Sequence, residues 1–124
     1  MKPYLLAAML AVLTLSGCVS TQQAYDWGEY DQLLYETYKE PTRAEALRLE
    51  LETHLAALEA GNAKVAPGLY AELGTLYLEA GDADRAIALY EKERAAWPES
   101  RGLMTALIVN LQRRKADADK EAAQ

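Results

Sequence analysis

Apolar side chains recur at intervals of three and four residues along most of the chain, and this spacing restricts the possible folds more than any other feature. Leu47, Leu51, Leu55 and Leu58 form one such series, which is typical of a helix that buries one face. Glycine and proline interrupt the pattern, and no segment shows the two-residue alternation of a strand. The sequence therefore predicts an all-α fold.

Five helices are expected, and they stack as antiparallel hairpins in a domain that covers residues 25–117. They cover residues 25–39, 42–60, 67–80, 82–96 and 100 to about 117. Thr42 with Glu45 forms a capping-box pattern, and Asp82 and Ser100 are the other candidate N-caps, while Pro67 suits a first turn. The fifth helix has an apolar stripe of Leu103, Met104, Leu107, Ile108 and Leu111. Residues 118–124 have nothing to bury, which predicts a frayed tail.

Residues 67–100 resemble the tetratricopeptide repeat, a helix–turn–helix of about 34 residues. The matching positions are Tyr70, Leu73, Gly74, Tyr77, Gly81, Ala86, Tyr90 and Pro98. Gly74 and Ala86 would let the two helices approach closely, with the larger residues packed on either side. Glu93 stands where the pattern prefers a small residue. An ordinary helical hairpin is the alternative interpretation.

The first 18 residues have the layout of an export signal. Lys2 is followed by an apolar run from Leu5 to Leu15, interrupted only by Thr14. That run is 11 residues long, whereas a helix needs about 20 residues to span a bilayer. We therefore expect a cleaved signal peptide, residues 1–17, rather than a permanent membrane helix.

Leu15, Ser16, Gly17 and Cys18 resemble the lipobox of bacterial lipoproteins. The resemblance implies a diacylglycerol thioether on Cys18, cleavage before Cys18 and acylation of the new amino group. The alternative is an ordinary exported protein in which Cys18 follows the cleavage site by chance. Cys18 is the only cysteine, so it has no disulfide partner within the chain, and lipidation explains its presence.

The lipid on Cys18 would hold the protein on a membrane, with residues 18–24 as a short polar tether. Two or three acyl chains anchor a protein firmly, whereas one chain holds it only marginally. An aspartate directly after the lipidated cysteine resembles an inner-membrane retention signal in enteric bacteria. Here that position is Val19. The expected location is therefore the periplasmic face of the outer membrane.

Charge and residue types disfavour several classes of function. The formal net charge is −6, and an acidic domain offers nucleic acid little counterion release. His54 is the only histidine and is interpreted as a partly buried structural residue, since metal binding would need further His or Cys ligands. No nucleophile motif surrounds a serine, and no glycine-rich phosphate loop occurs. We expect no catalytic residues, metal, cofactor or small-molecule substrate, and a small hydrolase is a remote alternative.

The first predicted helix is unusually aromatic, in a chain with eight tyrosines and no phenylalanine. Its aromatic residues are Tyr25, Trp27, Tyr30, Tyr35 and Tyr38. Trp27, Tyr30, Leu34 and Tyr38 are spaced as one helical face. These are more rings than one face can bury, so the cluster is a candidate partner surface. The alternative is that the rings close the open end of the helical stack.

Several ordered motifs together resemble a family of small Gram-negative lipoproteins, the domain of unknown function DUF4810. They are the lipobox, residues 25–30 (Tyr-Asp-Trp-Gly-Glu-Tyr), Leu34 with Tyr35, residues 67–74 and residues 97–100. The resemblance implies an outer-membrane lipoprotein without catalytic activity. It also implies a part in an envelope assembly, with a curli-secretion-type pore lipoprotein encoded nearby.

Two functions follow as hypotheses. The first is a non-catalytic, periplasm-facing lipoprotein that binds another envelope protein. The second is a structural lipoprotein that supports the outer membrane or peptidoglycan without a specific protein partner. The tether would hold the aromatic segment close to the membrane in either case.

Overall fold

The structure is a computed structural model and describes residues 24–123. Within that range the chain forms five α-helices and two short 3₁₀ helices, and no strand. The elements are α2 (Tyr30–Lys39), η1 (Pro41–Arg43), α3 (Ala44–Ala60), α4 (Leu69–Glu79), α5 (Ala83–Ala96), η2 (Pro98–Ser100) and α6 (Arg101–Ala122). The predicted all-α fold is confirmed. The predicted signal peptide and the lipobox residues lie outside the described range, as does nearly all of the tether.

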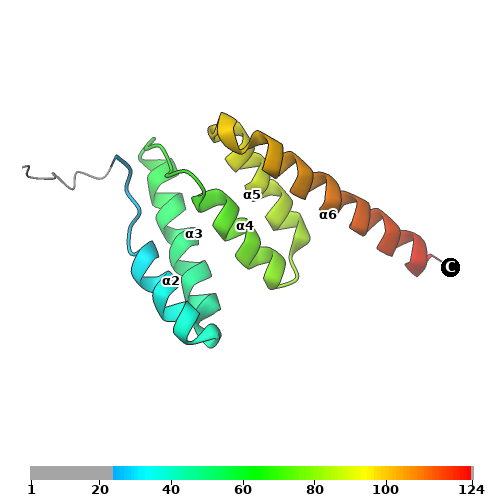
Figure 1. Ribbon diagram of the computed structural model, residues 1–124, viewed down its shortest axis with the longest axis horizontal. Helices are drawn as coiled ribbons and strands as arrows, with labels where there is room; N and C mark the ends of the chain where they lie inside the picture. Colours follow the sequence, from blue (N-terminus) through cyan, green and yellow to red (C-terminus); the bar gives the residue numbers. More distant parts are fainter. Residues whose placement is uncertain (1–23, 124) are drawn as a thin grey trace, which may run out of the picture.

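The helices lie side by side in chain order, from α2 at one side to α6 at the other (Figure 1). Each helix packs against the next, and α4 with α5 forms the most extensive pair. The segment before α2, residues 24–29, runs beside α3 and is called the strap below. None of the helices within residues 24–123 combines the length and apolar character needed to cross a membrane.

Two apolar clusters hold the stack together. The first contains the predicted leucine stripe of α3, which packs against the buried face of α4 and the loop before it; its members are Leu47, Leu51, Leu55, Leu58, Val65, Ala66, Leu69, Tyr70, Leu73, Leu76 and Tyr77. The second joins α5 to α6 through Ala86, Tyr90, Met104, Ile108 and Leu111. Four of the five residues predicted for the α6 stripe lie in or against this cluster. Leu103 is the exception, because 63% of it is exposed.

The start of α2 differs from the prediction. The helix begins at Tyr30 rather than at residue 25, because the backbone of Gly28 has a positive φ of 56°. Its N–H donates a hydrogen bond to Asp26 Oδ1 at 2.9 Å. That local turn is incompatible with helical backbone, so residues 24–29 form an irregular entry with bends and a turn instead.

Of the other four predicted helix starts, those at Asp82 and Ser100 are in the correct position, and those at Thr42 and Pro67 are wrong. Asp82 accepts a hydrogen bond from the Arg85 N–H at 3.0 Å, which confirms it as the N-cap of α5. Thr42 and Ser100 instead lie inside 3₁₀ turns that lead directly into α3 and α6, and neither caps a helix with its side chain. Proline begins both turns and fixes a φ suited to them. The α4 helix begins at Leu69, after Gly68 at φ 91° rather than at Pro67.

The C-terminal residues are helical where a frayed tail was expected. Helix α6 continues to Ala122, well past its last buried residue, Leu111. Alanine, lysine and glutamate have high helix propensity, which favours this continuation without burial. Ion pairs add to it, since Lys115 contacts Asp84 of α5 and Lys120 lies 3.8 Å from Asp117.

Candidate interaction surfaces

The aromatic segment divides into a packed part and an exposed part. Tyr25, Trp27 and Tyr30 pack against the first apolar cluster. The Tyr25 ring meets Trp97 edge-on, with centroids 5.4 Å apart, and Trp27 stacks on Tyr30 at 6.3 Å. Three of the five candidate partner residues therefore contribute to the core, as the alternative interpretation held.

His54 on α3 fastens the strap to the helical stack. Its Nε2 lies 3.0 Å from the backbone oxygen of Asp26, which can only accept the hydrogen bond. A Cβ at Gly28 would lie 3.0 Å from His54 Nδ1, so glycine is needed there both for its φ and for this close approach. His54 is partly buried, as predicted, and its contacts are structural.

The outer face of α2 carries the exposed part. Tyr35 is 58% and Tyr38 85% exposed, and Leu34 beside them is 39% exposed. Leu33 rather than Leu34 packs against the first apolar cluster, so the predicted common face of Trp27, Tyr30, Leu34 and Tyr38 is divided between packed and exposed residues. Asp31 and Lys39 lie on the same exposed face at its two ends, and Lys39 Nζ sits 4.8 Å from the Tyr35 ring centroid. We call these five residues, Asp31, Leu34, Tyr35, Tyr38 and Lys39, the α2 ridge.

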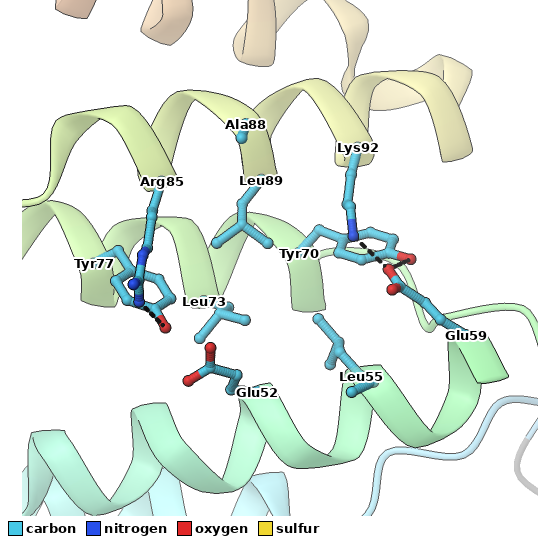
Figure 2. Close-up of a pocket in the computed structure, with 11 residues that line it drawn as sticks. Glu52, Leu55, Glu59, Tyr70, Leu73, Tyr77, Arg85, Ala88, Leu89 and Lys92 are labelled. Atoms are coloured by element: carbon cyan, nitrogen blue, oxygen red, sulfur yellow. Dashed lines mark hydrogen bonds and ion pairs between the residues drawn. The ribbon is translucent and has the colours of Figure 1, made fainter.

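A second surface is a groove on the other side of α3, which sequence reasoning missed. Helices α3 and α5 form its walls and α4 its floor (Figure 2), and it encloses about 280 Å³. Its lining residues are Glu52, Leu55, Ala56, Glu59, Tyr70, Leu73, Tyr77, Arg85, Ala88, Leu89 and Lys92. The middle is apolar, and the polar groups gather at the two ends.

Each end of the groove combines an acid, a base and a tyrosine from three different helices. At one end, Lys92 Nζ lies 2.7 Å from Glu59 Oε1, which also accepts a hydrogen bond from the Tyr70 hydroxyl at 2.8 Å. At the other end, Arg85 Nη1 donates to the Tyr77 hydroxyl at 3.0 Å, with Glu52 on the opposite wall.

Tyr70 and Glu59, at the first end, each keep one protonation state around neutrality. Burial raises the pKa of Tyr70 well above its usual value, and the adjoining Glu59 carboxylate raises it further. Hydrogen bonds from Lys92 and Tyr70 lower the pKa of Glu59. Both pKa values are shifted away from pH 7. The Tyr70 hydroxyl therefore stays a hydrogen-bond donor, and the Glu59 carboxylate stays ionised. This end of the groove presents fixed charges, which suits recognition rather than proton transfer.

The residues that carry the repeat resemblance bring α4 and α5 into close contact. A Cβ at Gly74 would lie 2.9 Å from Tyr90 Cε1 and 3.2 Å from the Ala86 backbone oxygen. Ala86 is fully buried, and Gly81 has the left-handed φ of 88° that its turn needs. The predicted close approach at Gly74 and Ala86 is confirmed.

Glu93, which stands where the repeat pattern prefers a small residue, is accommodated in the packed interior by hydrogen bonds. Only 1% of it is exposed, and its Oε1 accepts hydrogen bonds from the Gly68 N–H at 2.9 Å and the Ser100 hydroxyl at 3.1 Å. Glu93 therefore joins the start of α4 to the turn before α6. Sequence reasoning missed this role because Gly68 lies 25 residues from Glu93 in the chain. Glu93 Oε2 and Trp97 Nε1 are buried without a protein partner.

Neither surface has the residues of a metal centre. In the part of the chain that the structure covers, no group of three or more His, Cys, Asp and Glu side chains is arranged to hold a metal ion. Leu15, Ser16, Gly17 and Cys18 precede that part, so the lipidation site stays a prediction.

The described domain was compared with known proteins. A family model described as DUF4810, a domain of unknown function, matches residues 24–107. The match includes the strap, the α2 ridge and the whole groove, and it ends within α6. Comparison with curated proteins and with solved structures gave no match. Because the family model matches well over half of the sequence, the chain belongs to the DUF4810 family.

Proposed function

We propose that this protein is a non-catalytic interaction module of the bacterial envelope, held by lipid on Cys18 at the periplasmic face of the outer membrane. The observation that carries the proposal is the α2 ridge. It places two exposed tyrosines and an exposed leucine on α2, the helix at one side of the stack (Figure 1).

Exposed aromatic side chains of this kind suit a protein contact. Tyrosine supplies a large apolar surface with a polar tip and few rotatable bonds, and it is enriched among residues that dominate binding energy. Tyr35 and Tyr38 are adjacent on one helical face, so a partner could bury both together.

The direction of α2 favours access to the ridge. Tyr25 of the strap contacts Trp97, which directly follows α5, and α2 then leads away from that end of the stack (Figure 1). Its 10 residues span about 15 Å. Because Tyr25 contacts Trp97 and Cys18 precedes Tyr25 by seven residues, we propose that the Trp97 end of the stack faces the bilayer and that α2 leads away from the bilayer toward Tyr38. The partner is then another envelope protein, for which the family resemblance suggests a curli-secretion-type pore lipoprotein.

Removal of the lipid acceptor tests the anchor. Cys18→Ser is expected to abolish lipidation, because only a thiol accepts the diacylglycerol group. The measurements are membrane fractionation and the intact mass of the purified protein. Nearly all of the wild-type protein should be in the membrane fraction, and its intact mass should include two or three acyl chains. The variant should be absent from the membrane fraction, and its mass should include no acyl chain. Ser20→Ala is the matched control, and an unmodified wild type would contradict the anchor.

Loss of the ridge tests the contact. The double variant Tyr35→Ser/Tyr38→Ser is expected to bind its envelope partner at least about ten-fold more weakly. That is the effect of removing one dominant contact residue. The measurement is co-purification from detergent-solubilised envelopes after mild crosslinking. Leu103→Ser is the control, since Leu103 is similarly exposed on α6 and should leave the partner bound. Recovery of wild-type protein without any partner would contradict the proposal.

A further inference from the structure

Two polar atoms at the C-terminal end of α5 have no protein partner. Glu93 Oε2 and Trp97 Nε1 are both buried, and neither has a hydrogen-bond partner among residues 24–123. Such atoms are rare in folded proteins, because a buried donor or acceptor without a hydrogen bond loses its solvation without compensation. Each of the two atoms therefore indicates a ligand that the polypeptide itself does not supply.

The two atoms belong to neighbouring side chains. The Trp97 backbone N–H donates to the backbone oxygen of Glu93 at 2.9 Å, which places the two residues one helical turn apart. Both side chains contact the loop between α3 and α4. Glu93 Oε1 accepts the Gly68 N–H, and Lys64 Nζ lies 3.9 Å from the Trp97 ring centroid. An unpaired acceptor and an unpaired donor are therefore carried by adjacent side chains against one loop.

The Trp97 ring turns its polar edge inward. Trp97 as a whole is only partly buried, and a ring in such a position can direct its N–H toward solvent. Here the N–H is on the buried side of the ring instead. Tyr25 of the strap meets the ring edge-on, with centroids 5.4 Å apart, and Lys64 lies over it. These two side chains help to keep bulk solvent away from the ring.

The hydrogen-bonding types of the two atoms select the ligand. A carboxylate oxygen accepts and an indole N–H only donates, so a ligand that serves both must donate and accept at once. A metal ion cannot accept from the indole, and an aprotic anion cannot donate to the carboxylate. Because neither atom is open to solvent, the ligand must also be very small. Water meets all of these requirements.

We propose that one ordered water molecule bridges Glu93 and Trp97, and that Tyr25 of the strap closes its site. The water accepts from Trp97 Nε1 and donates to Glu93 Oε2. It completes the hydrogen bonds of the carboxylate that joins the start of α4 to the turn before α6. This inference goes beyond the proposed function and depends neither on the lipid nor on a partner of the α2 ridge.

Nuclear magnetic resonance on the purified full-length protein in detergent micelles detects the water directly. Trp27 and Trp97 are the only tryptophans, so Trp27→Phe identifies the Trp97 indole signal. The expected result is a cross-relaxation peak between this N–H and water, with the rotating-frame sign that distinguishes a bound water from hydrogen exchange. Absence of the peak would overturn the proposal. A protected N–H would then indicate a direct hydrogen bond to Glu93, and a rapidly exchanging N–H would indicate an indole that faces solvent.

Two pairs of variants locate the site. Glu93→Leu should remove the water peak because it removes the acceptor, whereas Glu91→Leu, at an exposed position of α5, should keep it. A peak that persists in folded Glu93→Leu would overturn the bridge. Tyr25→Leu leaves both polar side chains in place and should make the Trp97 N–H exchange with deuterium several-fold faster. Tyr35→Leu, on the exposed face of α2, should not, and equal rates for the two variants would contradict the closing role of Tyr25.

Discussion

Replacement of Glu93 by alanine is expected to lower the free energy of unfolding by about 3 kcal/mol, because it leaves buried partners without an acceptor. The Glu93 carboxylate accepts the N–H of Gly68 and the hydroxyl of Ser100, and neither has an obvious substitute once Oε1 is gone. The truncated side chain also leaves a cavity in a site that is 1% exposed. The two turns that Glu93 joins would separate first.

Urea denaturation followed by circular dichroism measures this effect. Glu91→Ala is the matched control, because Glu91 is exposed on the same helix and should change stability by no more than about 0.5 kcal/mol. Glu93→Gln keeps one acceptor oxygen and should fall between the two. Equal midpoints for Glu93→Ala and Glu91→Ala would mean that the buried carboxylate does not hold the turns together.

Gly74→Val is expected to destabilise the domain by about 3 kcal/mol through overpacking between α4 and α5. Even the Cβ alone would lie 2.9 Å from the Tyr90 ring and 3.2 Å from a backbone oxygen. The ring is 2% exposed and its hydroxyl lies 3.0 Å from Thr75 Oγ1, so it cannot swing aside without loss. Valine adds two further carbons to that contact.

Gly102→Val distinguishes packing from helix propensity. Gly102 is also helical, but a Cβ there would meet nothing within 4 Å. Valine has slightly better helix propensity than glycine, so this variant should be neutral or slightly stabilising in thermal unfolding. Similar losses at both positions would show that the close approach at Gly74 is not the cause.

The features that sequence predicted correctly depend on local signals. The stripe of Leu47, Leu51, Leu55 and Leu58 specifies the buried face of α3 by its spacing alone, and the Asp82 cap acts within four residues. The close contact at Gly74 was also predicted, since a small residue inside an apolar helix indicates an approaching neighbour.

The features that sequence missed depend on contacts between distant segments. The start of α2 is set by the turn at Gly28 and by His54, which lies 28 residues from its partner Asp26. The groove needs the register of three helices to bring Glu59, Tyr70 and Lys92 together. The seven-residue spacing of its acids is visible in the sequence, but nothing local aligns it with the other helices.

The most direct test of the central claim, that a protein covers the α2 ridge in the envelope, is hydroxyl-radical footprinting of Tyr35 and Tyr38. Their modification rates are compared between intact envelopes and the purified full-length protein in vesicles of envelope lipid, with Leu103 as an internal reference. Both tyrosines should react several-fold more slowly in the envelope, while Leu103 reacts equally in the two samples. Equal rates for the tyrosines in both samples would contradict the account.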